Sequence, residues 1–228
     1  MLRRLVKASA IVVGVGLAVA ACSPVKMGAA AIVGNERITI ATLDTEVTNL
    51  GQVAAQFPAE VNLNASQRTQ ATLTWLIRYQ IFEEMARQAG ITVTTAQGQK
   101  ALSQAVAMAE SSAEQQGLTH VTQNLILAAS GVPPNTSAEL GRYESIASQY
   151  LAIANGGTAP TSSSAQTAAG NKLNTAECQA AKALNIAVNP QFGQLDYNGY
   201  QVVTAPSPVT RTQGPVKSAS PVATAPAC

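Results

Sequence analysis

The segment from Ala65 to Ala89 constrains the fold most, because it predicts one long helix with a wide apolar surface. Asn64 and Gln67 have capping-box spacing at its start, and Gly90 suits the position after a helix end. Apolar side chains recur along one face at helical spacing, with three aromatic residues beside them: Leu73, Leu76, Ile77, Ile81 and Met85, flanked by Trp75, Tyr79 and Phe82. Such a surface must be covered by neighbouring helices or exposed as a binding groove.

Further helices are expected on both sides of this segment. Four stretches show helical periodicity, each followed by a stop signal: 43–57 before Pro58, 95–116 before Gly117, 121–130 before Gly131 and 137–155 before Gly156. The 95–116 stretch has a small, Ala-rich apolar face that permits close helix packing. A short helix over 174–184 completes the set, so the sequence predicts a mainly α fold of five to six helices.

A small β-hairpin is expected before the first helix. Two β-prone runs, Ala30–Val33 and Arg37–Ile40, surround Gly34 and Asn35, which tolerate the positive φ of a tight reversal. A lone hairpin is marginal in water, so it needs a third strand or a helix to cover it.

The N-terminus has the three parts of a bacterial secretory signal. Basic residues within Met1–Lys7 precede an uncharged apolar stretch, Ala8–Ala21, which is shorter than the ~20 residues of a membrane-spanning helix. Val19–Cys22 resembles a lipobox, which implies lipidation of the Cys22 sulfur and cleavage before it. We therefore expect a signal peptide over 1–21, a lipidated tether over 22–29, and a location on the extracytoplasmic face of the cell membrane. The Arg3–Arg4 pair invites a twin-arginine interpretation, but its flanking residues favour the general secretory route.

Charge and chemistry exclude several classes of function. Cleavage removes three basic residues from a precursor of net charge +2, which leaves a mature chain of net charge −1 without the basic patch of a nucleic-acid binder. His120 is the only histidine, so a His-based triad or metal site would have to use it, and it has no acidic neighbour. With no phosphate-binding loop or nucleophile elbow either, we expect no enzyme, no metal and no cofactor.

The remaining cysteines and the C-terminal half complete the organisation. Cys178 and Cys228 could pair in an oxidising compartment, or both stay free. Residues 156–170 are uncharged and rich in Gly, Thr, Ala and Ser, which predicts a flexible linker or surface loop. Residues 200–228 are rich in Pro, Ala, Val and Thr without periodicity, which predicts a disordered tail.

The order of these elements resembles the N-terminal chaperone domain of the SurA/PrsA group of envelope foldases, in the actinobacterial lipoprotein form that lacks the isomerase domain. Three segments carry the resemblance, which spans residues 28–195: Ala30–Thr39 is similar to the opening hairpin, Leu73–Ile91 to the central helix, and Val188–Gly193 to the closing segment. Gln191 departs from the family's usual basic residue. The resemblance implies a SurA-like helical domain over 30–199 whose C-terminal segment returns to the hairpin, with Ile186–Val188 as the third strand.

The resemblance also implies binding of unfolded or newly exported polypeptides without catalysis. Trp75, Tyr79 and Phe82 are the candidate contact residues, because amphipathic aromatics bind extended chains without demanding one sequence. The alternative places all three in the core of the longest helix. Two other functions stay open: a structural or adaptor lipoprotein that docks one envelope partner, and a prolyl isomerase, for which the residues after Gly156 are too few.

Overall fold

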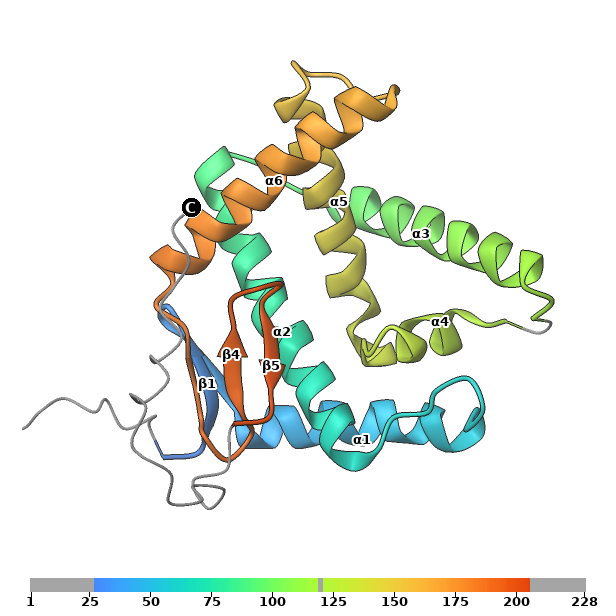
Figure 1. The fold of residues 1–228 in the computed structure, drawn as a ribbon, viewed down its shortest axis with the longest axis vertical. Helices are drawn as coiled ribbons and strands as arrows, with labels where there is room; N and C mark the ends of the chain where they lie inside the picture. Colours follow the sequence, from blue (N-terminus) through green and yellow to red (C-terminus); the bar gives the residue numbers. More distant parts are fainter. Residues whose placement is uncertain (1–26, 119–120, 206–228) are drawn as a thin grey trace, which may run out of the picture.

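Helix α2 (Ala65–Ala89) runs through the middle of the molecule, and the other elements lie around it (Figure 1). The computed structural model describes residues 27–118 and 121–205. The Asn64 side chain accepts a hydrogen bond from the Gln67 amide, and the Gln67 side chain accepts one from the Asn64 amide. Gly90 ends the helix in the left-handed conformation, with φ 67°. Both predicted ends of the helix are therefore confirmed.

The fold is mainly α, as predicted, with six helices and a few short strands in the part of the chain that is described. The other helical elements are α1 (Ile40–Gln56), α3 (Thr95–Gln115), α4 (Gln123–Ala129), the short 3-10 helix η1 (Pro134–Thr136), α5 (Ser137–Ala154) and α6 (Ser163–Ala183). The predicted linker or surface loop over 156–170 is correct only for 156–162, because helix α6 begins at Ser163 and not at 174 as predicted. Its Ser162 side chain caps the helix on the Ala165 amide, and small residues such as Ala169, buried at 1% exposure, let α6 pack closely.

The predicted hairpin is present and has a third strand. Strands β1 (Ala29–Val33) and β2 (Glu36–Thr39) pair antiparallel, and β3 (Ala187–Val188) adds to the other edge of β1. The Asn189 backbone N–H donates to the Ala30 carbonyl at 2.9 Å, and its side chain donates to Ala29 at 3.0 Å. The return of the C-terminal segment to the hairpin is thus confirmed.

A second hairpin was not predicted. Strands β4 (Gln194–Asp196) and β5 (Gln201–Val203) pair antiparallel beside α2, and the Val202 N–H donates to the Thr74 hydroxyl at 2.8 Å. The start of the predicted tail at residue 200 is therefore wrong. Composition alone suggested a tail, but burial of Tyr200 and Val202 against the main core holds this stretch in place. Residues 206–228 of that tail, and Cys22 with its predicted lipid, lie outside the described residues.

Helix α3 crosses α5 at one end and then extends away from the body of the molecule (Figure 1). Gly98 is its single buried residue, and it lies against Gly141 of α5. Beyond this crossing α3 faces α4, and we call α3 and α4 together the arm. None of the described helices is long and apolar enough to cross a membrane.

Candidate functional site

A cavity of about 580 Å³ lies between α2, the arm, α5 and strand β5, and we call it the central groove. Its walls mix apolar side chains with polar and charged ones. The side chains used below are Trp75, Arg78, Ala109, Tyr143, Glu144 and Val202.

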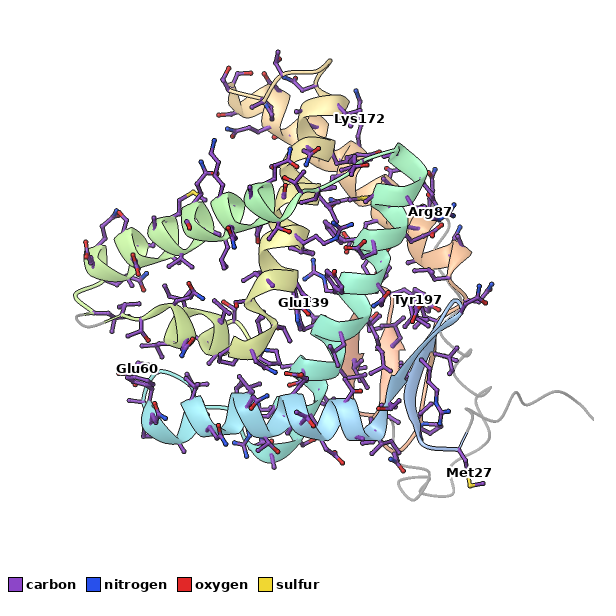
Figure 2. All side chains as sticks on the ribbon, turned by 180° about the vertical axis from the view of Figure 1, so that it is seen from behind. Met27, Glu60, Arg87, Glu139, Lys172 and Tyr197 are labelled. Carbon is purple, nitrogen blue, oxygen red and sulfur yellow. The ribbon has the colours of Figure 1, made fainter. Side chains whose placement is uncertain are left out.

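A second cavity of about 520 Å³, the outer groove, lies between the two helices of the arm and the α1–α2 connection. It is lined by apolar and small residues such as Ala113, Leu118 and Leu125. Glu60 lies at its rim, near the outer ends of α1 and the arm (Figure 2). Ala109, Ile126 and Ser130 line both grooves, so the two cavities meet at the same stretch of the arm.

The three predicted contact aromatics lie in three different environments. Trp75 is buried, with 7% of its surface exposed, and packs with Leu127 and Val132 in a small core cluster that borders the central groove, so the core alternative holds for most of its ring. Phe82 is 2% exposed in the main core, so it is not a surface contact residue, and the alternative that placed it in the core holds. Its ring packs on Tyr143 of α5 at a centroid distance of 4.1 Å.

Tyr79 lines a separate cavity of about 290 Å³ at the crossing of α3 and α5. Burial, and secondarily the Glu83 carboxylate, raise the pKa of Tyr79 to about 12. Arg142 of α5 holds Glu83 through two hydrogen bonds, one between Nη2 and Oε2 at 2.9 Å, and its Nη1 donates to the Val93 carbonyl at 3.0 Å. This ion pair joins α2 to α5 and gives Tyr79 a structural setting away from the central groove.

Tyr143 organises the floor of the central groove. Its ring meets Trp75 edge-on at 5.6 Å, and its hydroxyl accepts a hydrogen bond from Arg78 Nη2 at 3.1 Å. Arg78 in turn lies 3.7 Å from Glu177 of α6. The floor therefore combines an aromatic pair with a partly buried guanidinium.

Two carboxyl groups share that single guanidinium. Burial raises the pKa of both Glu144 and Glu177, and Arg78 only partly offsets the effect. Glu144 lines the groove and has no ion-pair partner among the described residues. Since Arg78 is already paired with Glu177, the groove has an excess of negative charge when both carboxyl groups are ionised.

The sequence did contain a signal for Arg78, Glu144 and Glu177, because each is a charged residue within the apolar face of a helix. Arg78 stands three residues after Trp75 and four before Phe82, which places it on the aromatic face of α2. Glu144 and Glu177 likewise occupy positions of the apolar stripes of α5 and α6. A charged residue inside an apolar stripe either pairs with another buried group or lines a cavity, and here both outcomes occur.

Residues 27–118 and 121–205 hold no cluster of three His, Cys, Asp or Glu side chains able to bind a metal. His120 lies outside these residues. Cys178 of α6 is disulfide-bonded, whereas the predicted partner Cys228 lies outside the described range.

Comparisons with protein-family models, curated proteins and solved structures found no match to this chain. We therefore infer the function from the geometry of the grooves and from the sequence resemblance.

Proposed function

We propose that this chain is an extracytoplasmic lipoprotein, held to the membrane through Cys22, that binds unfolded or newly exported polypeptides in its two grooves. It acts as a non-catalytic, chaperone-like module. The observation that carries the proposal is the meeting of the central and outer grooves along the arm, at Ala109, Ile126 and Ser130.

The shape of this surface suits an extended chain better than a small ligand. A small-molecule site encloses most of its ligand in one cavity of about 300–1,000 Å³. Here two cavities of that size follow one another along the arm. Such a path accommodates successive side chains of a polypeptide.

The chemistry of the walls supports the same proposal. Small residues of α3, Ala105 and Ala109 in the central groove and Ala113 in the outer one, leave room for side chains of different shapes. The part of Trp75 that borders the central groove adds an aromatic contact that does not select one sequence. The lipid at Cys22 would hold this surface near the membrane, where exported chains emerge unfolded.

Suppression of aggregation tests this function. The mature chain should reduce light scattering of an unrelated, chemically denatured protein after dilution, at near-stoichiometric ratios. Ala109→Glu places a charge where both grooves meet and should abolish the effect. Met108→Glu is the matched control, because Met108 is the preceding residue of α3, is 67% exposed and lines neither groove. Equal suppression by the two variants would contradict the proposed site.

Capture in cells separates the chaperone from the two alternatives. Crosslinking through a photoreactive residue at position 109 should recover many unrelated exported proteins. One recurring partner would indicate an adaptor lipoprotein instead. Turnover of an X-Pro peptide by the mature chain would indicate a prolyl isomerase.

A further inference from the structure

We propose that the central groove of the free protein is occupied by the chain's own C-terminal segment, residues 206–228, which an incoming polypeptide must displace. Occupancy of the groove by this segment involves no other protein. Its regulatory consequence rests on the proposed function.

The described part of the chain ends beside the central groove. Gln201 and Val202 of β5 line the central groove. Two residues further on, the Thr204 hydroxyl accepts a hydrogen bond at 2.9 Å from the side chain of Gln70, which lines the same groove. Residue 206 therefore follows directly from the wall of the groove.

The length and composition of residues 206–228 suit the central groove. The segment has 23 residues, with five prolines and no Asp or Glu. Pro-rich sequence favours an extended conformation of about 3.1 Å per residue, which gives a reach of up to ~70 Å. Helix α3, with 21 residues, is only about 32 Å long. The segment is thus long enough to line the central groove, and its many Ala, Val and Thr side chains suit the apolar and small side chains of the groove wall.

The charges of residues 206–228 also suit the central groove. The segment carries two basic side chains, Arg211 and Lys217. The central groove offers the Glu144 carboxylate, whereas Arg78 is already engaged by Glu177 at 3.7 Å. The charge of the segment is therefore complementary to the charge that the groove leaves uncompensated.

Tethering makes even a weak interaction effective. A segment joined directly to the groove wall has an effective concentration on the order of 1 mM. With an intrinsic dissociation constant of about 0.1 mM, it would lower the apparent affinity for an external polypeptide roughly tenfold. The segment would then act as a built-in competitor that only strongly apolar or abundant unfolded chains displace.

Intramolecular photocrosslinking in the full mature chain tests occupancy directly. A photoreactive residue at position 109 should crosslink to peptides within 206–228, and the same residue at position 108 should not. An excess of a denatured polypeptide should reduce the crosslink. Absence of the 206–228 crosslink at position 109, or equal yields at both positions, would overturn the proposal.

A mixture of isotope-labelled and unlabelled chains shows whether the segment occupies the groove of its own chain or the groove of a second copy. Crosslinks confined to like-labelled peptides support the intramolecular arrangement. Mixed-label crosslinks would show that a second copy supplies the segment, which would overturn it.

Charge reversal in the segment tests the consequence. The double variant Arg211→Glu with Lys217→Glu should bind a denatured polypeptide about tenfold more tightly than the parent chain. If both chains bind with equal affinity, the competitive role is wrong although the proposed function stands. If neither chain binds, the proposed function is wrong, and the crosslink still reports whether the segment occupies the groove.

Discussion

Gly141 of α5 lies directly against the backbone of Gly98 of α3, so closely that a methyl group on Gly141 would overlap the Gly98 carbonyl. Such a methyl carbon would lie 3.0 Å from the Gly98 carbonyl carbon and 3.1 Å from Leu102 Cβ. This contact between two glycines brings the backbones of α3 and α5 together at the point where the arm leaves the body.

The substitution Gly141→Ala should destabilise the protein by about 1–3 kcal/mol, because the added methyl forces two helix backbones apart. This loss would exceed the ~1 kcal/mol that alanine gains over glycine in a helix. Chemical denaturation followed by circular dichroism measures the free energy of unfolding.

Gly170→Ala in α6 is the control for that measurement. A methyl group there has no atom within 4 Å, so this variant should be more stable than the parent by up to ~1 kcal/mol. Similar changes in both variants would show that the crossing tolerates separation and that the arm is not fixed by this contact.

The buried Glu177 should make stability fall as pH rises. Burial, only partly offset by Arg78, raises its pKa in the folded state. Between the ordinary carboxyl pKa and this raised value the folded state holds a proton that the unfolded state has lost, so the contribution is present at low pH and lost as pH increases. Glu177→Gln should remove this decline and give a higher free energy of unfolding at pH 7 than the parent has.

Glu84 provides a control of opposite sign. Its hydrogen bonds from Arg87 lower its pKa, so its contribution is present above the ordinary carboxyl pKa and lost as pH falls through the lowered value. Glu84→Gln should therefore lower stability at pH 7. Free energies of unfolding from pH 2 to 8, each taken as the difference between variant and parent, give both dependences. Differences that change with pH in the same direction for the two variants would contradict the assignment.

The fold could be predicted in large part from local signals, because each of these helices carries its own punctuation. The capping box at Asn64 and Gln67 and the left-handed Gly90 determine both ends of α2 without help from the rest of the chain. Strand β5 lacked such signals, and the Ser162 cap of α6 stands in a run of Ser, Thr and Ala whose composition suggested a linker. Their order depends on long-range contacts, such as the Val202 N–H on the Thr74 hydroxyl, which composition does not reveal.

The candidate site was less predictable than the fold. Sequence identified Trp75, but periodicity could not show that Phe82 faces Tyr143 in the core while Trp75 borders a cavity. That difference depends on tertiary neighbours, since Phe82 packs in the main core and Trp75 beside Leu127 and Val132, which a single sequence does not show.

Lipidation at Cys22 predicts that the mature chain partitions with membranes and into a detergent phase. Cys22→Ala should prevent lipid attachment and leave the uncleaved precursor, because the thioether requires the Cys22 sulfur. Metabolic labelling with a fatty acid and the shift in intact mass measure both effects. A labelled, cleaved Cys22→Ala chain would contradict the lipobox assignment.

The disulfide of Cys178 should join it to Cys228 in the exported protein. The chain has three cysteines, and the proposed lipidation would use the sulfur of Cys22, which leaves Cys228 as the partner. Peptide mapping without reduction should find one crosslinked pair containing both residues. A pair between Cys22 and Cys178 in the mature chain would contradict lipidation and the disulfide assignment together.

Trp75 offers the most direct test of polypeptide binding in the grooves, because it is the only tryptophan in the chain and lines the central groove. Titration of the mature chain with a permanently unfolded, tryptophan-free polypeptide should give a saturable change in Trp75 fluorescence. Ala109→Glu should abolish the change, and Met108→Glu should retain it. A flat titration of the parent chain, or equal binding by the two variants, would contradict the proposal that these grooves bind unfolded polypeptides.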